Sequence, residues 1–275
     1  MIGLHEAPRI RTLRPKMGMP ALIELSSMEE NALLCQDLGL DFVELNMNMP
    51  YCFPQNLSAG QVRRLSAELG IDFTMHMPDD FDLGSLHPPV RQGTLDRSMD
   101  ALDWAIDAEL LLLNFHINPG IFFTLPNYRV YIFDKFYDQF RDNLVGAFSA
   151  LLDKANAHGV RLSVENVCNF DLPFIGRVLD DLVRLPGFHL TWDVGHDAKT
   201  AYKERAVLMK HEGCLAHMHL HDYDGKSDHQ VLFTGEIDII GMVLFAQAHH
   251  MSVVVETKTI DSLVQSVHRL DQRMN

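Results

Sequence analysis

Short, nearly continuous apolar runs alternate along the chain with longer segments in which apolar residues recur at helical spacing. Such runs are typical of parallel strands covered on their outer face by helices, and eight of them favour closure into a barrel. The expected strands are Ala21–Leu25, which is weak, and then Phe42–Leu45, Asp72–His76, Leu111–His116, Arg161–Glu165, His189–Asp193, Leu215–His219 and Ser252–Glu256.

The segments between the strands carry helix signals. Ser27 with Glu30, and Ser58 with Gln61, have the spacing of a capping box, and a glycine follows each of these two helices. Since no linker interrupts the alternation, we expect one (β/α)8 TIM barrel domain over residues 1–275. The later helices are expected near Leu95–Ala108, Phe133–His158, Leu172–Leu185, Ala201–His211, Ile237–His249 and Ile260–Arg273.

Side chains that can bind a metal stand at or beside the ends of seven of these strands. The carboxyl ends of parallel barrel strands open at one face, so these side chains are expected to gather there. Burial of an uncompensated charge is costly, and the recurrence therefore predicts bound cations. The seven residues are Glu44, His76, His116, Glu165, Asp193, His219 and Glu256.

Net charge and cysteine content indicate which partners the protein can bind and in which cellular compartment it lies. A formal net charge of −14 repels nucleic acid and anionic lipid at long range, so neither a nucleic acid nor a membrane partner is expected. Charged residues come early, from His5 onward, and no apolar stretch approaches the length of a membrane span. Cys35, Cys52, Cys168 and Cys214 lack a CxxC spacing and are expected to be reduced. These features predict a cytoplasmic protein.

The motifs FVEL, FTMHMP, LNFHxxPG, SVENV, TWDVGH, HMHLHD, SDHQ and VVVET follow one another over essentially the whole chain. In this order they resemble the xylose isomerase-like barrels. That superfamily includes sugar and sugar-phosphate isomerases and epimerases, and also the endonuclease IV (AP endonuclease family 2) type of DNA-repair nuclease. The resemblance implies a (β/α)8 fold with a metal centre at the carboxyl ends of the strands.

Three carboxylates and one imidazole, from Glu165, Asp193, His219 and Glu256, suit Mn²⁺, Mg²⁺, Co²⁺ or Zn²⁺. The resemblance implies that these residues hold a metal and that Glu165 and Glu256 also move protons beside a carbonyl. The metal would then polarise that carbonyl and stabilise an enediolate. The alternative is that the carboxylates only pair with Lys or Arg across the barrel.

His76 and His116 form a second pair of candidate ligands, with Glu165 as a bridge. The matching residues of the endonuclease IV branch bind a second zinc. The alternative is that both imidazoles hydrogen-bond substrate hydroxyls. His196 and His229 resemble ligands of that branch's third zinc, so we expect one to three metal ions.

The third site departs from the pattern of the endonuclease branch. Ser227 stands where that branch has an aspartate, and Asp228 lies next to His229. The loop after His76 also reads MPDDFD, and its Asp79 and Asp80 would repel a phosphate backbone.

Other residues are expected to bind substrate or to support the ligands. Phe122 and Phe123 lie in the aromatic loop 117–131, which either closes the barrel mouth over a small ligand or forms a homo-oligomer interface. His217 and His221 share a strand face with His219, and His217 is interpreted as a packed core group. The further substrate-contact candidates are Glu44, His196 and Lys226, and the supporting candidates are Asn166, Asp222 and Asp228.

These observations predict a divalent-metal-dependent isomerase or epimerase that acts on a small sugar, sugar phosphate or related polyol, with Glu165 and Glu256 as acid/base residues. The main alternative is a zinc-dependent phosphodiesterase similar to endonuclease IV. A third is a sugar-binding or metal-binding barrel without turnover, because fold alone does not establish chemistry.

Overall fold

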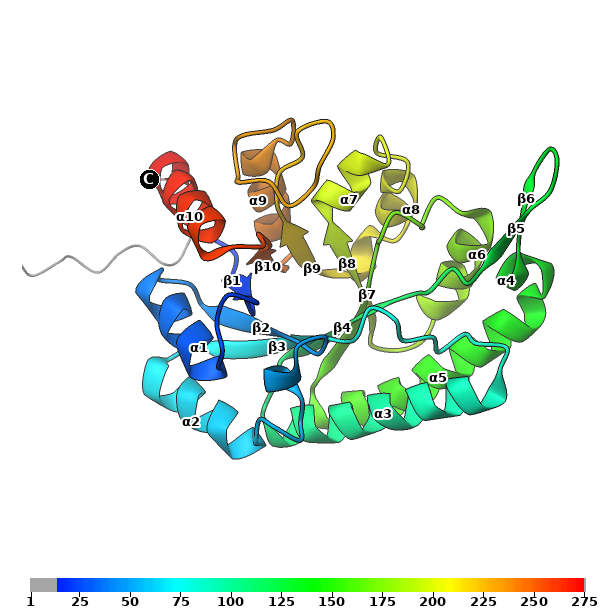
Figure 1. Cartoon of the computed structure of the whole chain (residues 1–275), viewed down its shortest axis with the longest axis horizontal. Helices are drawn as coiled ribbons and strands as arrows, with labels where there is room; N and C mark the ends of the chain where they lie inside the picture. The colour runs from blue at the N-terminus through cyan, green and yellow to red at the C-terminus, as the bar shows by residue number, and fades with distance from the viewer. Residues whose placement is uncertain (1–13, 275) are drawn as a thin grey trace, which may run out of the picture.

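The computed structural model describes residues 14–274, so the part of the charged N-terminal segment from His5 to residue 13 lies outside the described residues. Eight parallel strands close into a barrel in the order β1-β10-β9-β8-β7-β4-β3-β2, and helices surround it (Figure 1). This arrangement confirms the predicted (β/α)8 fold. The barrel strands are β1 (Met17–Pro20), β2 (Phe42–Asn46), β3 (Asp72–His76), β4 (Leu112–His116), β7 (Arg161–Glu165), β8 (Phe188–Asp193), β9 (Leu215–Leu220) and β10 (Ser252–Val255).

The helices begin close to the expected signals. Ser27 accepts a hydrogen bond from the backbone of Glu30, while the Glu30 carboxylate binds Ser26 instead of closing the box. Ser58 and Gln61 form the complete capping box. The helices are α1 (Met28–Asp37), α2 (Ala59–Leu69), α3 (Pro88–Asp107), α4 (Ile132–Lys135), α5 (Tyr137–His158), α6 (Pro173–Leu182), α7 (Val194–Lys199), α8 (Arg205–Lys210), α9 (Ile239–Ala248) and α10 (Ile260–Met274), with short 3₁₀ turns η2 (Pro50–Cys52) and η3 (Glu212–Cys214).

The first strand was predicted at Ala21–Leu25, and this prediction is wrong. The strand is Met17–Pro20, and the predicted segment turns back, with the amide of Leu25 bonded to the carbonyl of Leu22. Gly18 and the nearby prolines gave the segment the composition of a loop. A side chain at Gly18 would overlap the ring of Phe42 on the neighbouring strand, which explains a glycine inside this strand.

Several connections differ from the prediction. Helix α3 was expected to start near Leu95 but starts at Pro88. Proline fits the first turn of a helix, because its missing N–H is not needed there. The expected helix Phe133–His158 is broken at Phe136 into α4 and α5. Loop 117–131 contains an antiparallel hairpin of β5 (Phe122–Thr124) and β6 (Arg129–Tyr131). Within residues 14–274, every helix is too short or too polar to cross a membrane.

Side chains alternate between the barrel interior and the surrounding helices, as the pleat of a strand requires. Trp192 of β8 faces outward and packs edge-on against Phe245 of α9. Inside, the hydroxyls of Ser163 and Thr191 donate to the side-chain oxygen of Asn114, at 3.1 and 2.8 Å. This polar layer lies beneath the strand ends and supports the side chains at the mouth.

Candidate metal centre at the barrel mouth

Glu165, Asp193, His219 and Glu256 come together at the carboxyl ends of β7 to β10. One ligand-capable atom from each lies within 4.8 Å of the others. Nδ1 of His219 is 3.2 Å from Oε2 of Glu165 and 3.2 Å from Oε2 of Glu256. The strand register places the ligand-capable side chains at the same height in the barrel, because Asp193 pairs with His219 across β8 and β9.

The chemistry of these donors fits a divalent cation. Burial raises the pKa of Glu165 and Glu256, but the nearby His219 charge outweighs it and holds both values well below the usual range. The ring nitrogens of His219 are buried, and neither makes a hydrogen bond of normal geometry with the described residues. Glu165 and Asp193 are buried and Glu256 is half-buried, and a cation bound to their oxygens and to Nδ1 of His219 would compensate this charge.

Asp193 is positioned by the start of helix α7. Its Oδ1 accepts the backbone N–H of His196 at 2.7 Å, so Asp193 is the N-cap residue of that helix. Asn166 holds the Asp193 backbone from the other side: its side chain accepts from the nitrogen at 2.7 Å and donates to the carbonyl at 3.0 Å. The supporting position expected for Asn166 is therefore next to a candidate ligand.

His76 and His116 meet beside Glu165, as their positions at two strand ends predicted. Their Nε2 atoms are 3.1 Å apart and lie 3.4 and 3.5 Å from Oε2 of Glu165. His76 donates from Nδ1 to the carbonyl of Met77, so Nε2 is the ring nitrogen that faces the group. Burial lowers the pKa of His76, but the hydrogen bond and charge of Glu165 outweigh it and raise the value to about 9. Asp79 completes a second group suited to a metal.

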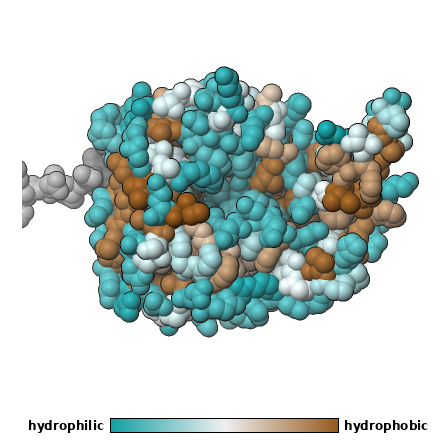
Figure 2. All heavy atoms as spheres, in the orientation of Figure 1, coloured by the Kyte–Doolittle hydropathy of each residue, from teal (hydrophilic) through white to brown (hydrophobic). Residues whose placement is uncertain are grey.

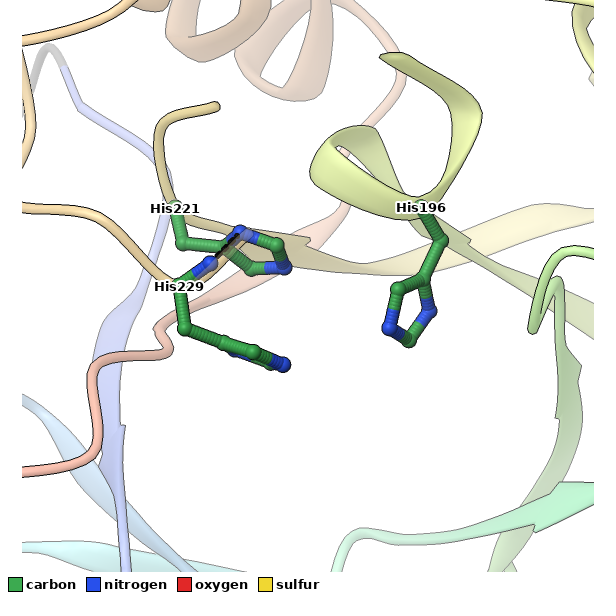
Figure 3. Close-up of side chains that lie close together, drawn as sticks. All are labelled: His196, His221 and His229. Carbon is green, nitrogen blue, oxygen red and sulfur yellow. Dashed lines mark hydrogen bonds between the residues drawn. The ribbon is translucent and has the colours of Figure 1, made fainter. Parts of the chain in front are cut away.

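His196 and His229 lie on the other side of the cluster and are joined by His221. Ligand-capable atoms of the three rings lie within 4.8 Å of one another (Figure 3). Nδ1 of His196 is 3.4 Å from Oδ2 of Asp193, and its Nε2 is 3.8 Å from Oδ2 of Asp228. His221 was not predicted as a ligand. It comes directly after β9 and alternates with His219, which places both side chains on the same face.

Glu44 lies inside the barrel and is 2% exposed. Its Oε1 is 3.1 Å from Nε2 of His217, and its Oε2 is 2.9 Å from Nε2 of His219. The structure therefore turns Glu44 toward the two imidazoles and away from the mouth, where a substrate contact was expected. His217 is fully buried and also bonds the Ser252 hydroxyl at 2.7 Å, in keeping with its interpretation as a core group.

The loop after β9 is held by Asp222, which was expected to orient an imidazole. Its carboxylate instead accepts four backbone N–H groups, from Tyr223, Thr234, Gly235 and Ile237. Asp228 pairs with Lys199 at 2.8 Å. Lys226 is exposed on the same loop.

The β5–β6 hairpin stands out from the body of the barrel (Figure 1). The ring of Phe122 packs on Tyr131, while Phe123 is 55% exposed. Figure 2 shows apolar side chains around the base of this hairpin and a hollow lined by hydrophilic side chains nearer the middle of the same face.

A cavity of about 270 Å³ adjoins Glu256. The loops after β10, β1 and β2 form it. Its polar groups include the amides of Asn46 and Asn48 and the ammonium of Lys258, which donates to Oε1 of Glu256 at 3.0 Å. Lys258 was not predicted from the sequence, because one lysine three residues past a strand gives no distinctive signal. The apolar side of the cavity is lined by Pro20, Ala21, Leu22, Ile23 and Met49.

Eight parallel strands with clustered carboxylates and imidazoles at one end define the class: a (β/α)8 barrel with candidate metal-binding groups. The chain belongs to the xylose isomerase-like TIM barrel family, whose model matches residues 32–268. Two uncharacterized proteins of Methanocaldococcus jannaschii are similar. One is 27% identical over 186 residues, covering 66% of this chain and 68% of the relative; the other is 23% identical over 231 residues, covering 78% and 74%.

Solved structures share this fold. A D-tagatose 3-epimerase-like protein superposes with a TM-score of 0.76 at 22% identity, covering 94% of this chain and 97% of that one. The 3-keto-D-glucoside 4-epimerase YcjR of E. coli gives 0.72 at 15%, covering 94% and 100%. An AP endonuclease, family 2, from Brucella melitensis gives 0.69 at 16%, covering 90% and 96%. At these identities the likeness establishes the fold alone.

Proposed function

We propose that the protein is a divalent-metal-dependent isomerase or epimerase of a small sugar, sugar phosphate or related polyol. The observation that carries the proposal is the group of Glu165, Asp193, His219 and Glu256 within 4.8 Å at the barrel mouth. A bound divalent cation would polarise a substrate carbonyl there and stabilise negative charge on its oxygen.

Glu165 and Glu256 are the proposed proton carriers. Each carboxylate is held by a neighbour: the amide of Asn114 donates to Oε2 of Glu165 at 2.5 Å, and Lys258 donates to Oε1 of Glu256. Donors of this kind keep a carboxylate ionised and fixed in direction, as a base that removes a proton from carbon requires.

The cavity beside Glu256 suits a molecule of monosaccharide size. Its volume of about 270 Å³ is slightly below the roughly 300 Å³ at which drug-sized ligand pockets begin. Amide and ammonium groups from Asn46, Asn48 and Lys258 supply donors for hydroxyl or phosphate oxygens. The epimerase names of two structural neighbours agree with a sugar substrate.

One observation favours a second candidate function, a zinc-dependent phosphodiesterase. His76, His116 and Glu165 form a second group beside the first, and clustered metals activate water against phosphate esters. Asp79 and Asp80 at the mouth and the net charge of −14 oppose a nucleic acid substrate. A binding barrel without turnover would need only the pocket.

Metal content and proton exchange test these alternatives. We expect protein purified without chelators to carry Mn, Mg, Co or Zn by elemental mass spectrometry, and Glu165→Gln to lose it. In D₂O the loaded protein should place deuterium on the carbon beside the carbonyl of a ketose or ketose phosphate, detected by NMR, and Glu256→Gln should not. Glu68→Gln, on the exposed face of α2, is the matched control.

Two other results would overturn the isomerase proposal. Two or three zinc equivalents with cleavage of a nitrophenyl phosphodiester, and no deuterium uptake, would favour the phosphodiesterase. Sugar binding without metal or exchange would favour a binding protein.

The β5–β6 hairpin is proposed either to close over the bound ligand or to form a homo-oligomer interface. Phe123→Ser separates the two roles. A lid predicts a higher KM with unchanged mass in solution, and an interface predicts a smaller sedimenting species.

A further inference from the structure

His221 lies between the candidate ligand Asp193 and the loop that carries His229. Figure 3 shows its ring stacked on the ring of His229, with His196 across from them; the two stacked centroids are 4.1 Å apart. Distance alone would make these three imidazoles a further metal site. The hydrogen bonds of His221 indicate a different role.

The position of the proton on His221 follows from one donor. The backbone nitrogen of His229 is 2.8 Å from Nδ1 of His221, and a backbone N–H can only donate, so Nδ1 carries no proton. The carbonyl of Asp222 is 3.3 Å from the same atom, but a proton placed there would face the His229 amide proton. The neutral ring is therefore protonated on Nε2.

That Nε2–H donates to Asp193. The distance from Nε2 to Oδ2 is 3.0 Å, and the other carboxylate oxygen is occupied by the N-cap hydrogen bond from His196. Both ring nitrogens of His221 are thus used within the protein, and neither offers a free lone pair to a metal.

A glycine makes room for this ring. A Cβ atom at Gly195 would lie 1.9 Å from Cε1 of His221, so the imidazole rests directly on the first turn of α7. On the other side, His229 has a φ of +55°, which is uncommon for a residue with a side chain. Its amide bond to His221 helps to hold this backbone and turns Nδ1 of His229 to within 3.3 Å of the Glu256 carbonyl.

We propose that His221 is a positioning residue that holds two parts of the site: the carboxylate of Asp193, and the loop that carries Asp228 and His229. Its Nε2–H fixes the orientation of the Asp193 carboxylate, and its Nδ1 fixes the backbone that presents Asp228 and His229. The Asp193 half rests on the proposed metal centre, whereas the loop half does not.

Two substitutions separate these halves. His221→Asn keeps an acceptor close to the place of Nδ1 and loses the donor to Asp193. His221→Gln keeps a donor close to the place of Nε2 and loses the acceptor for the His229 amide. Mn²⁺ affinity, measured by competition with a chelator, reports on Asp193, and hydrogen–deuterium exchange of residues 222–237 reports on the loop.

We expect His221→Asn to weaken Mn²⁺ binding about tenfold to a hundredfold, as loss of a partner behind a metal ligand does, with little change in loop exchange. His221→Gln should do the reverse. His221→Leu and Gly195→Ala should show both defects, and the exposed His268→Asn should show neither.

Nitrogen NMR of the diamagnetic protein should show His221 as the Nε2–H tautomer with or without Mg²⁺. Equal Mn²⁺ affinity and equal loop exchange in all His221 variants would overturn the proposal, as would a change in the His221 nitrogen signals typical of a metal ligand. If the wild type binds no metal, the proposed function fails, while loop exchange and the tautomer still test His221.

Discussion

Oε2 of Glu44 lies 2.9 Å from Nε2 of His219, on the nitrogen opposite the one that faces Glu165 and Glu256. Burial alone would raise the pKa of Glu44, but the charges of His219 and His217 and the hydrogen bond of His217 lower it below its ordinary range. When the ring is neutral, a carboxylate behind it holds the proton on Nε2, which leaves Nδ1 to bind a metal and makes it a stronger ligand. Glu44 therefore supports the site from within the barrel.

Glu44→Gln should weaken metal binding without removing a ligand. We expect Mn²⁺ affinity to fall about tenfold to a hundredfold, the usual cost of losing such a partner. Chelator competition measures the change, with Glu68→Gln as the surface control. Unchanged affinity in Glu44→Gln would show that the carboxylate plays no part in holding His219.

The metal-free protein should lose stability both in acid, below about pH 4.5, and as the pH rises above about 6.5. The lowered pKa values of Glu165 and Glu256 add stability above the unfolded value near 4.3, and it is lost as the pH falls. The raised pKa of His76, about 9, adds stability that is complete below about 6.5 and is lost as the pH rises. The pKa of His219 is also raised, so His219 contributes in the same way as His76.

Urea unfolding with a chelator should therefore show a loss of about 1 kcal/mol per pH unit between pH 7 and 9. Mn²⁺ should reverse this trend, because metal binding displaces protons from the imidazoles and strengthens as the pH rises. A metal-free protein that gains stability from pH 6.5 to 9 would contradict the charge state assigned to His76 and His219.

Asn114 gives a separate test of how Glu165 is held. Its amide donates to Oε2 of Glu165 at 2.5 Å, and its oxygen accepts from Ser163 and Thr191. Asn114→Ala removes a hydrogen bond to the charged form and should raise the pKa of Glu165. The acidic limb of the pH profile of Mn²⁺ binding should move to higher pH. Asn118→Ala, in the loop after β4, is the matched amide control, and an unmoved acidic limb in Asn114→Ala would refute the role.

The sequence predicted the barrel and its strand-end residues because both depend on local patterns. Apolar runs and helix caps define the units, and parallel strands bring their carboxyl ends together whatever the loops do. This is why His76 and His116, far apart in the chain, meet at 3.1 Å as expected.

The sequence could not show which way each side chain points within the barrel. Glu44 and Glu165 both lie on strands, yet only the structure shows that Glu165 faces the mouth while Glu44 lies below His219. The strand at Met17–Pro20 was missed because the need for Gly18 comes from Phe42 on another strand. Asp222 was likewise given an imidazole partner, since nothing in the sequence reveals that the amides of residues 234, 235 and 237, later in the same loop, return to its carboxylate.

Asp222 should therefore contribute to stability and loop order. A buried carboxylate that accepts four backbone N–H groups is well compensated, and an amide in its place turns one acceptor into a donor that faces an N–H. Hydrogen bonds to a charged group contribute about 1.5–3 kcal/mol each, so we expect Asp222→Asn to lower the free energy of unfolding by about 2–3 kcal/mol.

The same variant should increase amide exchange across residues 222–237, with little change in helix α3. Urea unfolding and hydrogen–deuterium exchange of the chelator-treated protein measure both effects without any contribution from metal. Asp96→Asn, which affects only an exposed hydrogen bond with Gln92, is the matched control and should stay within about 0.5 kcal/mol of the wild type. If Asp222→Asn matched this control in both measurements, the Asp222 carboxylate would not be what holds the His229 loop. The backbone pair of Asp222 with Gln230 and the amide bond of His229 to the His221 ring would then account for its place.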